Sequence, residues 1–250
     1  MAIKRWALNT LFMTVGLGAA LVNVGTSPAR GQSREELREQ FQQTYPLQPG
    51  GRVSLENING TVRVAAWDRN EVRVEAVKRA YTAERMQEAE IKIDADPSAV
   101  RIRTRYPHSS MNWHSDEPKR YHNPASVDYT LTVPRGARLD EIKLINSPLD
   151  LSDLTGEVNA SVINGKVTAR GLAGRTRLSV INGRLEAAFT QLDESRTVEL
   201  SSVNGPVALT IPSDANAEIR AGTVHGSITN DLGLPVRRGR YVGRDLAGQL

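Results

Sequence analysis

The stretch SVINGK at 161–166 returns as SVINGR at 179–184, 18 residues further along the chain. Looser copies are KLINSP at 143–148, SSVNGP at 201–206 and GTVHGS at 222–227. A fixed period that carries the same apolar positions is typical of repeat architectures, in which each unit buries its apolar face only against its neighbours. The repeat therefore constrains the fold more tightly than it constrains any chemistry.

Stacking the rungs on one another predicts columns of equivalent side chains. The first column is Leu144, Val162, Val180, Ser202 and Thr223, the second is Ile145, Ile163, Ile181, Val203 and Val224, and the third, after the turn, is Leu149, Val167, Leu185, Val207 and Ile228. We expect the column of Ile163 to be buried, so that Ile163→Asp would place an unpaired charge in the core and unfold the repeats. The last two rungs are longer, and their extra residues, 189–196 and 212–217, are expected in outward loops.

An asparagine or its equivalent occupies the turn of every rung. The column contains Asn146, Asn164, Asn182, Asn204 and His225, and a small residue follows each of them: Ser147, Gly165, Gly183, Gly205 and Gly226. Asn and Gly tolerate the left-handed backbone of tight turns, and stacked amides can hydrogen-bond from one rung to the next. We therefore interpret the column as turn-forming and structural, not as a polar binding row.

Two all-β arrangements use such a pattern. An antiparallel meander would place an Asn-Gly hairpin at each turn, whereas a β-solenoid would stack one coil of 18–22 residues on the next. A meander requires only alternating residues and turns. Stacking also explains why nearly identical five-residue strings recur at a spacing of 18. The repeat therefore favours a β-solenoid over 135–250.

The residues before the repeats predict further β structure. Residues 50–134 alternate apolar and polar side chains between turn signals, and 82–90 predict one short helix or long turn. We expect this β-rich part to be continuous with the solenoid. Residues 32–49 are polar and rich in Glu, Arg and Gln, and they predict a leader or a short helix that ends at the Pro and Gly residues after it.

The first 31 residues have the features of a secretory signal peptide. Lys4 and Arg5 precede an apolar run from Trp6 to about Val24, and small residues near its end suit a cleavage site. The alternative is a retained anchor, but the run is too polar and Gly-rich for a span of ~20 apolar residues. We expect cleavage, export to the periplasm or the cell surface, and no integral membrane span afterwards. The chain has no Cys, so packing must hold it together without disulfides.

The charge balance argues against a nucleic-acid partner. Three of the 32 basic residues lie in the signal, which leaves 29 basic residues against 28 acidic ones. Nucleic-acid binding needs a concentrated basic face, which a nearly neutral chain does not supply. One weak basic run, of a kind that can touch anionic lipid or glycan, lies near the C-terminus at Arg237, Arg238, Arg240 and Arg244.

Residues 106–127 predict one long loop, because they are rich in Pro, Ser and His and show no periodicity. Its candidate ligand-binding residues are Tyr106, His108, Trp113, His114, Tyr121 and His122. The His spacings of six and eight fit no compact metal-ligand motif, so we expect no metal site. Flat aromatic rings offer a large contact area at low entropic cost. The loop is therefore a candidate surface for an envelope glycan or protein, and the alternative is a solvated loop.

No catalytic constellation is evident. Asp150, Asp153 and Glu157 are close in sequence, but general acid–base catalysis needs paired carboxylates at set separations, and these three do not recur in register. The serine that opens each SVING-type string has no neighbouring His to act as its base. No GxSxG, HExxH, P-loop or dinucleotide fingerprint occurs. We expect no catalytic residues and no cofactor.

The segment PLQPGGRVSLENINGTVRVAAWDRNEVRVEAVKRA at 46–80, with the later VINGKV and VINGRL strings, resembles a bacterial family of exported β-strand-repeat proteins. The family is commonly labelled a candidate adhesin domain, related to the heads of autotransporter adhesins, and otherwise a domain of unknown function. The resemblance spans roughly 44–245. It implies a right-handed parallel β-helix in the cell envelope or outside the cell, with no established catalytic residues. Family members usually continue beyond the GRDLAGQL segment at 243–250 into a final rung, so we also expect an exposed strand edge that can pair with another chain.

These features predict an exported, non-enzymatic β-solenoid that acts as an adhesin-like binding module or as a scaffold of the envelope. Two other classes stay open. One is a carbohydrate-active β-helix enzyme with its site on a side face, and the other is an accessory protein of envelope stress or assembly.

Overall fold

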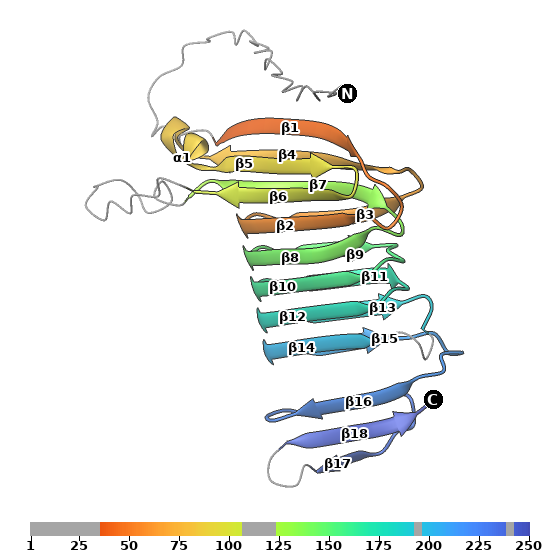
Figure 1. The fold of residues 1–250 in the computed structure, drawn as a ribbon. Helices are drawn as coiled ribbons and strands as arrows, with labels where there is room; N and C mark the ends of the chain where they lie inside the picture. Colours follow the sequence, from red (N-terminus) through yellow and green to blue (C-terminus); the bar gives the residue numbers. More distant parts are fainter. Residues whose placement is uncertain (1–35, 107–123, 193–196, 239–242) are drawn as a thin grey trace, which may run out of the picture. The chain divides into compact units, whose positions relative to one another are not determined.

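The computed structural model describes residues 36–106, 124–192, 197–238 and 243–250. In those ranges the chain is all-β, with 18 strands and one short helix, α1 (Ala83–Glu88). The strands form an eight-stranded, a seven-stranded and a three-stranded sheet (Figure 1). None of the helical structure in the described ranges is long and apolar enough to cross a membrane.

Consecutive strands of the repeats alternate between the two large sheets. The seven-stranded sheet takes β8 (Arg138–Asn146), β10 (Val158–Asn164), β12 (Thr176–Asn182) and β14 (Val198–Asn204), and the eight-stranded sheet takes β9 (Leu149–Ser152), β11 (Val167–Leu172), β13 (Leu185–Phe189) and β15 (Val207–Thr210). Neighbouring rungs pair in parallel and in register, with Val162 opposite Val180 and Asn164 opposite Asn182. Parallel pairing of equivalent residues is what stacked coils require, whereas a meander would pair them antiparallel.

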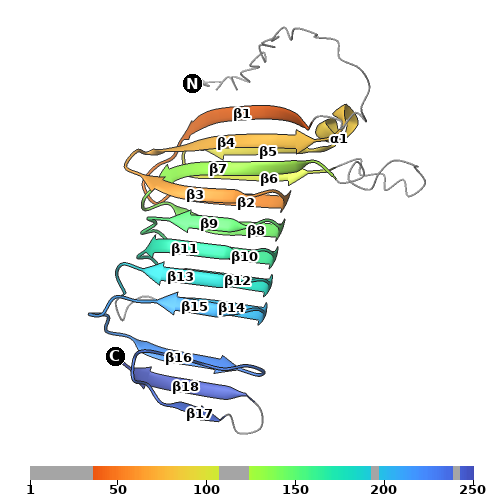
Figure 2. The ribbon, with the colours of Figure 1, turned by 180° about the vertical axis from the view of Figure 1, so that it is seen from behind.

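The first coil of the chain is inserted between two later ones. Strand β2 (Arg52–Asn59) lies between β6 (Ala99–Arg105) and β8, and β3 (Val62–Trp67) lies between β7 (Ser126–Pro134) and β9. Figure 2 shows the same order from behind. The buried Asn57 marks the insertion, because its Nδ2 donates to Val127 O at 2.9 Å and to Asn59 O at 3.1 Å. This amide links the first coil to β7, a strand that comes later in the sequence.

At the N-terminal end of the stack, antiparallel strands are added to both large sheets, so each of these sheets contains parallel and antiparallel pairs. Strand β4 (Glu71–Ala80) pairs antiparallel with β7 and with β1 (Leu37–Pro46), and β5 (Glu90–Asp96) pairs antiparallel with β6. The helix expected within 82–90 is confirmed as α1, whose N-cap Thr82 accepts the Arg85 N–H at 3.2 Å.

The short helix expected within 32–49 is wrong, because residues 37–46 form β1. The segment LREQFQQTYP is rich in Arg, Glu and Gln, which favour a helix. The free edge of β4 supplies backbone partners along all of β1, and Phe41 and Tyr45 pack partly against the core. Tertiary pairing therefore overrides local propensity.

The core lies between the two large sheets and contains the first three members of the first and third predicted columns, whereas Val207 in the third column is exposed. Val162 and Val167 are fully buried with their equivalents Val180 and Leu185. The expected burial of the Ile163 column is wrong, because Ile163 is exposed. Successive residues of a strand point to opposite faces, so two adjacent columns cannot both face the core. Ile163→Asp therefore adds a charge to the surface and does not bury it.

The rung expected at 222–227 does not continue the parallel stack. Strand β16 (Glu218–Thr223) pairs antiparallel with β18 (Arg244–Gln249), which also pairs with β17 (Val236–Arg238). The three strands form the separate three-stranded sheet. All six residues of β16 pair with β18, so this segment belongs to an antiparallel sheet although its sequence carries the repeat.

Candidate functional site

Five asparagines form a hydrogen-bonded row along the turns of the stack, which we call the asparagine ladder: Asn59, Asn146, Asn164, Asn182 and Asn204. In each step the Nδ2 group donates to the Oδ1 atom of the preceding rung, at 3.1 Å for the first step and 2.9 Å for the other three. The expected structural role is confirmed for the four asparagines of the predicted column, whereas the rung of His225 lies outside the parallel stack. The alignment of the repeats missed Asn59, although its Asn-Gly turn carries the same signal.

The residue after each ladder asparagine must be small because the turns approach one another closely. Gly183 has a φ of +148°, and a Cβ atom there would lie 1.9 Å from Gly165 O. Gly205 repeats this relationship against Gly183. The close approach holds the asparagine side chains of adjacent rungs within hydrogen-bond distance.

A row of aliphatic side chains runs beside the ladder on the outer surface of the seven-stranded sheet. Its members are Ile58, which is half-buried, and Ile145, Ile163, Ile181 and Val203, whose side chains are 38%, 37%, 42% and 73% exposed. They precede the ladder asparagines in sequence and face solvent at the spacing of the strands, ~4.8 Å. We call the aliphatic row and the asparagine ladder together the ladder face.

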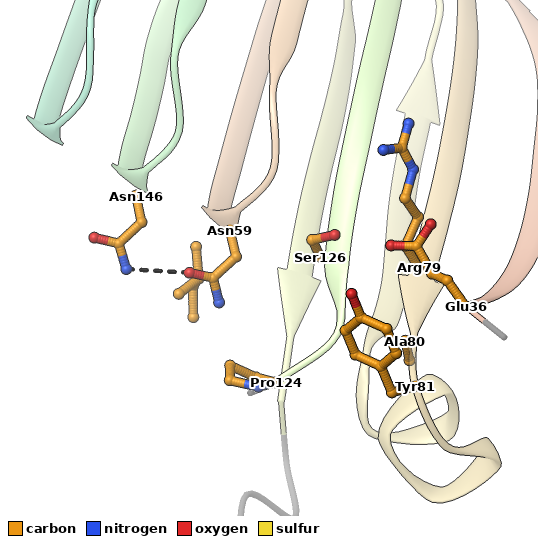
Figure 3. Close-up of a pocket in the computed structure, with 9 residues that line it drawn as sticks. Glu36, Asn59, Arg79, Ala80, Tyr81, Pro124, Ser126 and Asn146 are labelled. Atoms are coloured by element: carbon orange, nitrogen blue, oxygen red, sulfur yellow. Dashed lines mark hydrogen bonds between the residues drawn. The ribbon is translucent and has the colours of Figure 1, made fainter. Parts of the chain in front are cut away.

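The ladder face leads into a pocket of about 600 Å³ at its N-terminal end (Figure 3). The lining residues are Glu36, Ile58, Asn59, Arg79, Ala80, Tyr81, Pro124, Ser126 and Asn146. Ile58 begins the aliphatic row, and Asn59 and Asn146 begin the ladder. The pocket and the ladder face are therefore one continuous surface, built from strands that are far apart in the sequence.

The pocket offers amide, guanidinium and hydroxyl groups. Arg79 donates from Nη2 to Asp128 Oδ2 at 2.7 Å, and Asp128 Oδ1 accepts the Thr61 N–H at 2.8 Å. The Arg79 Nε atom is buried and has no partner within the described part of the chain. Glu36 is the one carboxylate among the lining residues. This set suits hydrogen bonding to a polar ligand better than it suits proton transfer between paired acids.

The half-buried Tyr106 and the buried Tyr129 hold the chain on either side of residues 107–123. The Tyr106 hydroxyl donates to Ala125 O at 2.8 Å, and burial raises the pKa of Tyr106 to about 12. The Tyr129 hydroxyl lies 2.8 Å from Thr104 Oγ1, and burial likewise raises the pKa of Tyr129. Tyr106 is thus an anchor that points inward. The other five predicted loop residues, His108, Trp113, His114, Tyr121 and His122, lie outside the described residues.

The remaining candidates do not gather into a site. No group of three His, Cys, Asp or Glu side chains that could hold a metal ion occurs in the ranges that the structure covers. The stacked serines Ser161, Ser179 and Ser201 pair in register on the outer face of the sheet. Arg238 lies opposite Arg244 across β17 and β18, while Arg240 falls outside the described ranges.

No protein-family profile matches the chain, and no curated protein matches it. Solved structures do resemble it. A candidate cell-adhesion protein from Clostridium sporogenes aligns at 11% identity and a TM-score of 0.46, over 70% of this chain and all of that one. A candidate adhesin from Bacteroides fragilis aligns at 10% identity and a TM-score of 0.26, over 70% and 97% of the two chains. One from Parabacteroides distasonis aligns at 9% identity and a TM-score of 0.23, over 69% and 79%. Likenesses this distant do not identify a ligand, so the function rests on the geometry of the ladder face.

Proposed function

We propose that this chain is an exported, non-enzymatic binding module of the adhesin-like kind, wound as a right-handed β-solenoid, and that the ladder face with its pocket is the ligand surface. The observation that carries the proposal is the continuity of the two features. Ile58, Asn59 and Asn146 line the pocket and also begin the exposed rows that run along the stack.

The exposed aliphatic row supports a binding role, because apolar side chains that stay in water without a partner are unfavourable in free energy. Four consecutive rungs keep Ile145, Ile163, Ile181 and Val203 in water. Covering apolar surface is favourable by roughly 25 cal/mol per Å². Contiguous exposed apolar patches with polar rims mark interaction sites in soluble proteins, and the asparagine ladder supplies such a rim on one side.

The shape of the surface favours an elongated ligand. One end of such a ligand would enter the pocket, where Arg79, Ser126 and the Asn59 amide provide polar contacts. The rest would lie along the aliphatic row, one rung after another. An envelope glycan or an extended protein segment has this form, and both present apolar and hydrogen-bonding groups.

The chemistry of the pocket supports a binder over the carbohydrate-active enzyme. Retaining and inverting glycosidases place two carboxyl groups about 5 to 9 Å apart. The lining residues contribute Glu36 alone, and Asp128 is engaged by Arg79 and by the Thr61 N–H. If the chain were such an enzyme, it would slowly cleave a bound glycan, and the binding assay below would detect the cleaved product.

The test is a binding screen of the purified chain against arrays of envelope glycans and surface proteins. The double variant Ile145→Ser, Ile163→Ser removes two members of the aliphatic row without touching the core. The matched control is Leu232→Ser, because Leu232 is similarly exposed and lies outside the stack. Binding that the double variant loses and the control keeps is the expected result. Equal binding by all three proteins, or release of cleaved glycan, contradicts the proposal.

Export has its own test. Cell fractionation with protease treatment of intact cells distinguishes periplasm from surface. Retention of the full-length chain in the cytoplasm would contradict the exported role, whatever the binding screen shows.

A further inference from the structure

Four members of the asparagine ladder are followed directly by glycine, which exposes them to a spontaneous chemical change. They are Asn59, Asn164, Asn182 and Asn204. Where no side chain crowds the next residue, its backbone nitrogen can attack the Cγ atom of the asparagine amide. Asparagine is among the thermolabile residues of proteins. Because the two reacting residues are the same at all four sites, the fold decides which site reacts.

The reaction consumes water and releases ammonia. As the backbone nitrogen of the glycine bonds to Cγ, it gives up its proton, and the Nδ2 group leaves with that proton as ammonia. The product is a cyclic succinimide. Water then opens the ring at either carbonyl carbon, which returns a proton to the backbone nitrogen and gives aspartate or isoaspartate. The change needs no oxidant, metal or enzyme.

In the inner rungs the reacting groups are already engaged. Gly165 donates its N–H to Asn182 O at 3.1 Å. Gly183 donates its N–H to Asn204 O at 3.0 Å. Asn164 and Asn182 also use both ends of the side-chain amide within the ladder, with Nδ2 as donor and Oδ1 as acceptor. Attack at either site therefore requires three hydrogen bonds to open, and the bonded N–H keeps its proton away from solvent bases.

The last rung of the parallel stack lacks this protection. Within the described part of the chain, the Gly205 N–H has no hydrogen-bond partner and Asn204 Oδ1 accepts no hydrogen bond. One hydrogen bond holds the Asn204 side chain, from its Nδ2 to Asn182 Oδ1 at 2.9 Å. Asn204 and Gly205 are both exposed, whereas Gly165 and Gly183 are half-buried. Solvent therefore reaches the nucleophile and the amide of this site together.

Asn59 is an intermediate case. The Gly60 N–H has no partner in the ranges that the structure covers, but the Asn59 side chain is held at both ends. Its Oδ1 accepts from Asn146 Nδ2 at 3.1 Å, and the side chain also hydrogen-bonds with the Tyr106 hydroxyl. Asn59 and Gly60 are half-buried, so this site should react more slowly than Asn204.

We propose that Asn204 is a site of spontaneous deamidation, and that the ladder protects the other Asn-Gly pairs from the same change. The new carboxylate lies at the C-terminal end of the ladder face. It accepts hydrogen bonds but cannot donate one, so the bond to Asn182 Oδ1 is lost and two oxygen atoms face each other. As the protein ages, the change adds a negative charge to the ladder face and loosens its last rung.

The experiment is incubation of the purified full chain at mildly alkaline pH for several weeks, followed by peptide mapping with mass spectrometry. Trypsin cleaves after Lys and Arg and therefore places the four Asn-Gly pairs in four different peptides. Deamidation at Asn204 should be at least about tenfold faster than at Asn164 or Asn182, because two fewer hydrogen bonds must open.

The same incubation in concentrated guanidinium chloride is the control, since without the fold the four sites should react at similar rates. The proposal is overturned if Asn164 or Asn182 reacts as fast as Asn204 in the folded protein. It is equally overturned if denaturant leaves the preference for Asn204 unchanged, because the preference would then come from the local sequence.

A variant tests the role of the ladder itself. Asn182→Ala removes the acceptor of the one hydrogen bond that holds the Asn204 side chain, so the rate at Asn204 should rise about fivefold. Ser179→Ala is the matched control, because Ser179 lies on the same strand outside the ladder, and it should leave the rate unchanged. An unchanged rate in Asn182→Ala, in protein shown to be folded by circular dichroism, contradicts protection by the ladder.

Discussion

Asn182 donates a hydrogen bond from Nδ2 to Oδ1 of Asn164 at 2.9 Å, although the two residues are 18 positions apart in the chain. Asn164 in turn donates to Asn146 at the same distance. Every inner member of the asparagine ladder therefore acts as donor and acceptor at once. The ladder is directional, because all of its amides donate toward the N-terminal end of the stack.

The first prediction concerns this double role. Asn164→Ala removes one donor and one acceptor, and each net hydrogen bond contributes ~1 kcal/mol. We expect the free energy of unfolding to fall by about 1–2 kcal/mol in a urea titration. Asn159→Ala is the control, because Asn159 is exposed on the same strand outside the ladder. Equal loss in both variants would show that the ladder does not stabilise the fold.

The second prediction concerns the close approach of the turns. Gly183→Ala forces a Cβ atom against Gly165 O at 1.9 Å from a left-handed backbone. We expect a loss of at least about 3 kcal/mol in unfolding free energy, or no folded protein at all. Gly136→Ala should be nearly neutral, because its Cβ would meet no atom within 4 Å. A mild effect at Gly183 would mean that the turns can separate without cost.

The third prediction separates two adjacent residues by the face they occupy. Val162 is fully buried and Ile163 is exposed. Val162→Asp buries an unpaired charge and should cost more than about 4 kcal/mol, whereas Ile163→Asp should change stability by about 0.5 kcal/mol or less. Thermal melting followed by circular dichroism compares them directly. Similar melting temperatures for the two variants would contradict the orientation of β10.

The fourth prediction is a loss of stability at high pH. Burial raises the pKa of Tyr106 to about 12 and also raises that of Tyr129. Above the ordinary tyrosine pKa of about 10, the unfolded chain ionises these groups while the native state keeps them neutral. Their contribution is complete below about pH 10 and is lost progressively toward pH 12.

The measurement is urea unfolding at several pH values, together with the ultraviolet absorbance of tyrosinate. Tyr106→Phe lacks the hydroxyl that donates to Ala125 O, so it should start from a lower stability but lose less of it between pH 10 and 12. Parallel pH profiles for the variant and the wild type would show that Tyr106 titrates as it does in the unfolded chain.

The register of the repeats could be predicted from the sequence, because equivalent residues of successive rungs lie beside one another in the stack. The pairing of Val162 with Val180 and of Asn164 with Asn182 follows directly from the 18-residue spacing. The alternation of faces along a strand also predicts that Val162 and Ile163 point to opposite sides. The expectation of a buried Ile163 rests instead on the similarity of the isoleucines in successive rungs. Similar side chains recur on the outer face as well as in the core.

The insertion of the first coil and the pocket could not be predicted in this way. Which strand lies beside β2 depends on the path of the chain through space. The sequence marks the place by Asn57, at a position where the next rungs have Leu144, Val162 and Val180. The pocket combines Arg79 and Ser126 with Asn59, from strands β4, β7 and β2. No spacing rule relates such residues.

The inserted coil also affects which strands must be present before the N-terminal part of the stack can form. Val53 on β2 pairs with Val100 on one side and with Leu139 on the other, and neither neighbour exists until much more of the chain has been made. The native neighbours of the first coil on both sides therefore come from later parts of the chain, so this part of the stack does not follow the order of synthesis. Later rungs such as β12 and β13 need only the rung before them, so they can be added one at a time. The order of the strands thus divides the molecule into a part whose pairing needs strands on both sides of β2 and a part in which each rung needs only the one before it.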